Sequence, residues 1–424
     1  MLLPSGRADL LSEASTNIKS NSYLLIFLCV LLYFTSYITR INFNACIAEI
    51  INSSVITKTE AGTIGTAMFF FYGTGQLISG FLCDKIRPSK IILIGLFLTM
   101  ACNSLLPLCT DVVSMSIIWG INGFAQAMFW PPIVKIMSMA LSEEYYSKGC
   151  LFVSIAAHAA TVFVYLAVPA CINMLNWKII FFISAVIAFI TAIVWGTSFS
   201  KIGKTLSVKH VPTATKYENK PKVSITPILI ISGAILLLFA IIVQGFLKDG
   251  YTTWMPVYLT EVFSINSSST IMLNLFLPAV SIACTTLASF LYKKVFAQNE
   301  VRASFMYFFI ALVLSIVLVF ICNISAIGTL IIVSLITGCM HSVNLMLVSL
   351  LPARFSFCGK VGAMSGITNA CTYIGSSISS FGLAYIAENS GWQSVIIILT
   401  GLALMGIIFC LFSYKKWKLF IYKK

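Results

Sequence analysis

Long apolar runs separated by short polar breaks dominate this chain. Each run has roughly 20 residues or more, the length at which a helix rising 1.5 Å per residue crosses a hydrocarbon core of about 30 Å. The pattern therefore predicts an all-α integral membrane protein with twelve membrane-spanning helices. We expect these spans at residues 22–50, 60–83, 89–109, 113–139, 148–174, 177–199, 224–262, 266–292, 302–323, 325–353, 360–387 and 391–413.

The longest hydrophilic break lies in the middle of the chain, between the sixth and seventh runs, and it is rich in lysine. Its position predicts a basic linker between two bundles of six helices. The expected organisation is an N-terminal tail at 1–21, a first bundle at 22–199, a linker at 200–223, a second bundle at 224–413 and a basic tail at 414–424.

Composition agrees with this pattern. Hydrophobic residues make up 59% of the chain and charged residues 9%, and the mean hydropathy is +0.98, which excludes an ordinary soluble enzyme. The 13 cysteines are scattered singly, without metal-ligand spacing. Neither a nucleotide-binding Walker motif nor an HExxH zinc motif occurs. We therefore expect no enzyme activity, no metal and no cofactor.

The formal net charge of +14 indicates orientation in the bilayer rather than nucleic-acid binding. Lysine and arginine concentrate in the tails and after even-numbered spans, and positive charge favours the cytoplasmic side. Both termini are therefore expected in the cytoplasm, with the lipid bilayer as a partner and the chain as a monomer. The four cations outside this pattern are Arg40, Lys58, Lys178 and Lys248.

The two halves carry matching features, which indicates an internal repeat. Arg40 in the first span and Lys248 in the seventh are 208 residues apart, and the stretch 80–85 recurs at 289–294 with an offset of 209. Transporters built from such repeats commonly bind substrate at the repeat interface near the middle of the bilayer.

Arg40 and Lys248 lie within apolar sequence that continues for about ten residues beyond each of them. A cation in a span costs on the order of 2.5–3.5 kcal/mol on insertion scales, so such residues usually face a polar pathway. Two cations at equivalent depth predict a cavity for an anion. The alternative is that each side chain extends to the outer interface.

Tyr33, Tyr37, Arg40 and Asn44 follow helical spacing and share one face of the first span. This polar stripe predicts a cavity wall in which the guanidinium binds a carboxylate or phosphate; helix-to-helix packing is the alternative. Weaker single signals are Tyr72 with Gln76, Gln126 with Trp130, and the histidines His158 and His341.

Asp249 directly follows Lys248 in the seventh span. The two residues form a pair that neutralises charge within one helix, which is a purely structural interpretation. Alternatively, Asp249 releases Lys248 when substrate arrives, or takes up a proton.

The loop after the second span resembles the signature of the major facilitator superfamily, G-x-x-x-D-[RK]-x-x-x-x-[RK]. Gly80, Asp84, Lys85 and Lys90 match it, with Arg87 between them. In that superfamily this loop holds the cytoplasmic gate. The resemblance therefore implies a gating role for Gly80, Asp84, Lys85 and Arg87.

Four further segments resemble the organophosphate:phosphate antiporter family across nearly the whole chain: Tyr37-x-x-Arg40-x-Asn42, the stretch 123–132, Ala157-His158 and the stretch 254–259. Members exchange phosphate esters for inorganic phosphate through paired arginines of the first and seventh helices. The resemblance implies a substrate site made of Arg40, Lys248, Tyr33, Tyr37, Tyr72, Gln126, Trp130, His158, Asp249 and Tyr373.

One departure from the family concerns the second arginine, whose position holds Lys248, while Thr253 replaces an acidic residue of some members. Lysine is a point charge rather than a planar fork, which makes a less charged ligand such as a sugar acid more plausible.

These observations predict a secondary transporter, in a bacterial plasma membrane, of a small organic anion. The favoured substrate is glycerol-3-phosphate or a sugar phosphate, exchanged for inorganic phosphate by alternating access. Two alternatives remain open: a proton-coupled symporter of a sugar acid or carboxylate, and a transporter-like receptor for sugar phosphate.

Overall fold

The computed structural model describes residues 5–205, 225–358 and 361–422, and every regular element in this part of the chain is helical. In the first half these are α1 (Ser5–Asn52), α2 (Lys58–Lys85), α3 (Pro88–Leu105), η1 (Leu106–Leu108), α4 (Val112–Gln126), α5 (Trp130–Ala140), α6 (Glu143–Met174) and α7 (Ile179–Thr205). In the second they are α8 (Ile225–Ser232), α9 (Ala234–Phe263), α10 (Ser267–Leu273), α11 (Phe276–Lys294), α12 (Glu300–Ile321), α13 (Ala326–Asn344), η2 (Leu345–Leu350), η3 (Leu351–Cys358) and α14 (Val361–Tyr422).

Ten helices in the described residues are long and apolar enough to cross a membrane. The last of them, Met364–Ile421, has 58 residues and contains the final two predicted spans. Gly391 separates these spans with a φ of 78°, a left-handed conformation that glycine adopts without steric cost. The predicted span 60–83 is the apolar part of α2. The predicted twelve spans therefore all correspond to helices.

Several predicted spans are interrupted rather than continuous. Gly233, with a φ of 73°, separates α8 from α9 within the predicted span 224–262. The predicted span 325–353 begins as α13 and then passes through the π-helical turn η2 into the 3-10 segment η3. Most of the predicted linker 200–223 lies outside the described residues.

Local capping explains where several helices begin. Thr57 and Glu60 form a reciprocal capping box at the start of α2. Asp111 accepts a 2.9 Å hydrogen bond from the Ser114 backbone nitrogen at the start of α4. The side-chain and backbone hydrogen bonds of Ser114 hold the pKa of Asp111 below its ordinary value. Polar caps therefore lie at the ends of apolar runs and set their limits.

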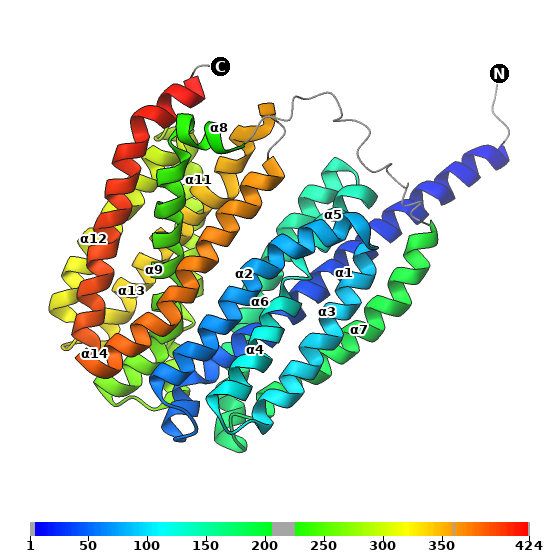
Figure 1. Cartoon of the computed structure of the whole chain (residues 1–424). Helices are drawn as coiled ribbons and strands as arrows, with labels where there is room; N and C mark the ends of the chain where they lie inside the picture. The colour runs from blue at the N-terminus through cyan, green and yellow to red at the C-terminus, as the bar shows by residue number, and fades with distance from the viewer. Residues whose placement is uncertain (1–4, 206–224, 359–360, 423–424) are drawn as a thin grey trace.

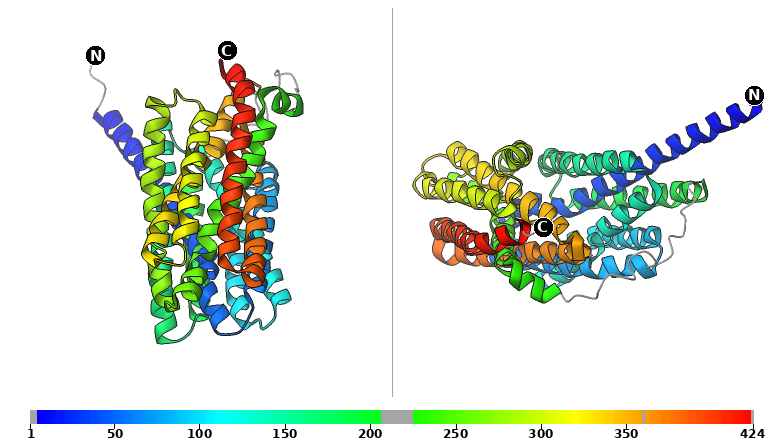
Figure 2. Two further views of the ribbon diagram at one scale, coloured as in Figure 1. Left: turned by 90° about the vertical axis from the view of Figure 1, so that its left-hand side faces the viewer. Right: turned by 90° about the horizontal axis from the view of Figure 1, so that it is seen from above.

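The helices form two groups, α1–α7 and α8–α14 (Figures 1 and 2), as expected for a fold of two pseudo-symmetric halves. Within the first group α1 packs on α6, α2 on α4 and α3 on α7; within the second α9 packs on α14 and α11 on α13. The halves meet where α2 packs on α14, α6 on α10 and α1 on α9.

The start of α1 and the end of α14 lie on the same side of the molecule (Figure 1). On the opposite side, which we call the closed side, hydrogen bonds join the halves. Asn52 bonds Ser267 at 2.9 Å and Ser268 bonds Asn173 at 2.8 Å. The ribbons of the two halves diverge toward the side of the termini (Figure 1).

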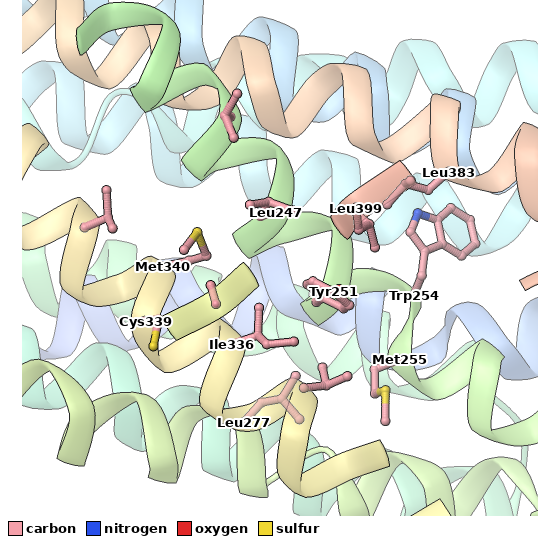
Figure 3. Packing of buried hydrophobic residues seen from close by; sticks show 14 of the residues in the cluster. Leu247, Tyr251, Trp254, Met255, Leu277, Ile336, Cys339, Met340, Leu383 and Leu399 are labelled. Carbon is pink, nitrogen blue, oxygen red and sulfur yellow. The ribbon is translucent and has the colours of Figure 1, made fainter. Parts of the chain in front are cut away.

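The core of the second half orients α9 (Figure 3). Leu247, Tyr251 and Trp254 of this helix are buried in the same cluster as Met340 of α13 and Leu383 of α14. Because these side chains occupy the face of α9 that points into its own half, Lys248 and Thr252 are left on the face that points toward the first half.

Candidate functional site

A cavity of about 210 Å³ lies between the two halves, which suits a small solute better than a large ligand. Its walls come from both halves, since α1, α2 and α6 contribute from the first and α9, α11, α13 and α14 from the second. The polar residues that line it are Tyr37, Arg40, Asn44, Tyr72, His158, Thr161, Tyr165, Lys248, Asp249, Thr252, Thr253, Ser281, His341 and Tyr373.

Arg40 is held in this cavity by aromatic rings. Its guanidinium carbon lies 4.3 Å from the ring centroid of Tyr37 and 4.9 Å from that of Tyr72. Tyr373 of α14 packs edge-on against Tyr72, with centroids 4.6 Å apart. Among the described residues no carboxylate lies within ion-pair distance of Arg40, so its charge is available to an anion in the cavity.

Lys248 and Asp249 form an ion pair with 3.3 Å between Nζ and Oδ2, and their side chains are 14% and 18% exposed. The same carboxylate oxygen accepts a hydrogen bond from the Ser376 hydroxyl of α14. No sequence pattern singled out Ser376, because its role depends on the packing of α14 against α9.

Two glycine positions make that packing possible. A Cβ on Gly375 would lie 2.0 Å from the carbonyl oxygen of Ile242, and one on Gly245 would lie 2.1 Å from that of Thr372. Only glycine permits such an approach of two helix backbones. It brings Ser376 within reach of Asp249.

The two histidines noted in the sequence line the same cavity from opposite halves, His158 from α6 and His341 from α13. Thr253, at the position of the missing acidic residue, accepts a 3.3 Å hydrogen bond from Asn44 of α1. Thr252 follows Lys248 by four positions, so helical spacing could have identified it. Ser281 carried no such signal.

Three residues implied by the family resemblance are absent from the lining of this cavity. Tyr33 packs on Tyr37 and Trp130, with ring centroids 5.2 and 5.3 Å apart. Gln126 is buried within the first half, where it donates to Thr39 at 2.8 Å and accepts from Ser36 at 2.6 Å. Tyr33 and Trp130 therefore adjoin the site, while Gln126 connects α4 to α1.

The loop assigned to gating lies on the side of the termini. Gly80 has open space around it, and Arg87 is exposed at the start of α3. The side chains of Asp84 and Lys85 lie outside the described part of the structure. No group of three or more metal-ligating side chains occurs within the described residues.

Comparison with protein families shows which family this chain belongs to. The model of the Major Facilitator Superfamily matches residues 26–380. The chain belongs to the Major Facilitator Superfamily. The predicted twelve-helix fold is thereby confirmed, and family and fold alike are those of membrane transporters rather than enzymes.

Relatives within the superfamily agree with the resemblance to organophosphate transporters. The glycerol-3-phosphate transporter of Bacillus subtilis (strain 168) is 24% identical over 409 residues, covering 90% of each chain. A probable hexose phosphate transport protein of Chlamydia pneumoniae is 28% identical over 117 residues, 28% of this chain and a quarter (25%) of that protein. The membrane sensor protein UhpC of Escherichia coli (strain K12) is 27% identical over 106 residues, covering 25% of this chain and 24% of that one.

Solved structures show the same fold at low sequence identity. A bacterial homologue of the human lysosomal transporter Spinster, inward-facing and occupied, matches with a TM-score of 0.73 and 13% identity, over 93% of this chain and 97% of that one. A point mutant of the nucleoside transporter NupG matches with a TM-score of 0.71 and 13% identity, over 92% of this chain and 100% of that one.

Proposed function

We propose that this protein is a secondary active transporter that exchanges an organic phosphate ester for inorganic phosphate. The substrate would be glycerol-3-phosphate or a sugar phosphate. The observation that carries the proposal is that Arg40 of α1 and Lys248 of α9, from opposite halves, line one cavity. A site with cations on both walls suits a phosphoryl group, whose oxygens accept charge-assisted hydrogen bonds.

The aromatic residues around Arg40 support the same substrate class. The rings of Tyr37 and Tyr72 both contact the guanidinium of Arg40. The hydroxyls of Tyr37 and Tyr373 and the imidazoles of His158 and His341 offer hydrogen-bond partners for the remaining oxygens of a phosphate ester. The named phosphate-ester transporters among the relatives favour this interpretation over other small anions.

The closed side supports transport by alternating access. Hydrogen bonds join the halves on the side opposite the termini, so substrate would enter or leave this conformation on the side of the termini. We assign that side to the cytoplasm from the distribution of lysine and arginine, and the protein to a bacterial plasma membrane. Asp84, Lys85, Arg87 and Gly80 would gate this side.

The test is counterflow in proteoliposomes loaded with inorganic phosphate. We expect uptake of labelled phosphate, competed by glycerol-3-phosphate or a hexose phosphate, and loss of at least about a hundredfold in Arg40→Ala. Lys248→Ala should lose most exchange and Lys248→Arg should retain it, because arginine keeps the charge. Lys178→Ala, in a predicted outer loop, is the matched control.

Two other results would replace the proposal. Accumulation of a carboxylate that follows a pH gradient and ignores internal phosphate would identify a proton-coupled symporter, which the Asp249 carboxylate in the cavity favours as second candidate. Saturable binding of a sugar phosphate without flux would identify a sensor.

A further inference from the structure

The cavity contains one carboxylate among its charged groups. Asp249 lies against Lys248 at 3.3 Å, while Arg40 contacts the rings of Tyr37 and Tyr72 and has no carboxylate within ion-pair distance among the described residues. The cavity thus presents one cation that is free to bind an anion and one whose charge is already balanced. This asymmetry bears on the charge of the transported anion, and the inference rests on the proposed function.

The Asp249 carboxylate has a partner besides Lys248. The Ser376 hydroxyl donates to its Oδ2, and the close packing of Gly245 and Gly375 holds α9 and α14 together at this level. If Lys248 rotates toward a bound anion, the Asp249 carboxylate still has the Ser376 hydroxyl as a hydrogen-bond partner in the cavity. Its negative charge then lies beside the bound anion.

The remaining titratable groups that line the cavity are the phenols of Tyr37, Tyr72, Tyr165 and Tyr373 and the imidazoles of His158 and His341. Counted by formal charge, with phenols and imidazoles neutral, Arg40, Lys248 and Asp249 give the cavity a net charge of one positive unit. An anion with a single negative charge neutralises it, whereas a doubly charged anion leaves an excess charge in an environment of low dielectric constant.

We propose that Asp249 is a specificity-determining residue that lowers the charge of the preferred anion from two to one. The site then takes the singly charged form of a phosphate ester in preference to the doubly charged form. Without the Asp249 carboxylate, Lys248 and Arg40 together match a doubly charged phosphoryl group.

The test uses two probes of the same shape and different charge. Methyl sulfate carries one negative charge at any pH above the strongly acidic range, and methyl phosphate carries two at pH 8. Each probe is titrated against the purified full-length protein at pH 8, and its half-saturating concentration is read from the rise in thermal stability and from inhibition of phosphate counterflow. The measured quantity is the ratio of the two half-saturating concentrations.

In Asp249→Asn we expect this ratio to shift toward methyl phosphate by at least about fivefold relative to wild type, since the lost charge lies within ion-pair distance of Lys248. Asparagine keeps the size of the side chain and accepts the Ser376 hydrogen bond. Asp249→Ser is measured in parallel, so that poor folding of one variant does not decide the result. A smaller shift in the folded variants overturns the inference.

Two further variants separate charge from local structure. Ser376→Ala removes the hydrogen bond and keeps the charge, so its ratio should stay close to wild type; a shift as large as that of Asp249→Asn overturns the inference. Asp111→Asn makes the same chemical change at the α4 cap outside the cavity and should leave the ratio unchanged.

The thermal readout distinguishes the inference from the proposed function. If wild type binds both probes but does not exchange phosphate, the proposed function fails, while a shifted ratio in Asp249→Asn still supports the charge preference. If phosphate exchanges and the ratio does not shift, the inference alone fails. If neither probe stabilises wild type or inhibits counterflow, the inference is overturned, and phosphate exchange still decides the proposed function.

Discussion

Lys58 at the start of α2 and Glu261 near the end of α9 form an ion pair of 2.7 Å across the two halves. Trp392 of α14 donates its indole N–H to the same Glu261 oxygen at 2.8 Å, and the Lys58 ammonium lies 5.0 Å from the Trp392 ring centroid. Lys58, one of the four cations outside the cytoplasmic distribution, therefore has a partner on the closed side.

This contact predicts that Lys58 helps to keep the closed side closed. Lys58→Gln should shift the conformational equilibrium by about 0.2–1 kcal/mol, the usual contribution of a partly exposed ion pair. Faster hydrogen exchange at the first turns of α2 would report it. Lys178→Gln, a change of the same type elsewhere on the predicted outer side, should leave exchange there unaltered, and equal effects of both would contradict the role of Lys58.

The rings beside Arg40 predict a difference between Tyr72→Phe and Tyr72→Leu. Phenylalanine preserves the aromatic face 4.9 Å from the guanidinium, so phosphate affinity should remain close to wild type. Leucine removes the cation–π contact, which contributes about 0.5–1 kcal/mol or more, and affinity should fall about twofold to fivefold. The half-saturating phosphate concentration in counterflow measures both. If Tyr72→Phe also lost phosphate affinity, that loss would show that the Tyr72 hydroxyl binds substrate.

Close contact between α9 and α14 predicts a strong effect of Gly375→Ala. The added Cβ would overlap the Ile242 carbonyl oxygen at 2.0 Å, and relief of such overpacking typically costs about 1–3 kcal/mol. We expect a lower Tm in detergent and weaker phosphate binding, because the helices separate beside Ser376. Gly382→Ala is the control on the same helix, since nothing lies within 4 Å of its added Cβ; it should be neutral or slightly stabilising.

A buried ionic cluster near the termini predicts the largest stability effect. Glu300 at the start of α12 is 1% exposed and accepts hydrogen bonds from Tyr292 at 2.7 Å, Arg354 at 2.7 Å and Trp417 at 3.2 Å. Arg354 also donates to the Gln298 carbonyl oxygen at 2.6 Å. The cluster therefore joins α11, α12, η3 and α14 at one end of the second half.

Glu300→Ala would leave Arg354 without its carboxylate partner. Loss of one member of a buried pair typically costs about 3–5 kcal/mol, so the Tm in detergent should fall more than in any variant above. Glu300→Gln keeps the shape of the side chain, so its Tm should fall less. A Tm for Glu300→Ala within a degree of wild type would contradict a stabilising role for this cluster.

The helices and the central cations were predictable because both depend on local sequence. A run of apolar residues must satisfy its backbone hydrogen bonds within itself in lipid, so it forms a helix. Arg40 and Lys248 were identifiable because a cation in such a run is costly unless a polar interior receives it. Their equivalent positions in the repeat predicted that they line one cavity, and they do.

Other features depended on how the helices are rotated and packed. Gln126 is as polar as the residues in the stripe of α1, yet its amide faces Ser36 and Thr39 inside the first half. Ser376 contacts Asp249 only because two glycines allow α9 and α14 to approach closely. Ser376 and Asp249 are 127 residues apart in the sequence, and no local pattern identifies a hydrogen-bond partner at that separation.

The sequence by itself determined the number and approximate limits of the spans, the repeat and the presence of cations in the bilayer interior, since insertion into lipid is decided segment by segment. Only the tertiary structure decided which side of the molecule is closed, where Lys58 finds its partner Glu261 and which carboxylate balances Lys248. These depend on contacts between distant helices, whose rotation is set by side-chain packing rather than by hydropathy.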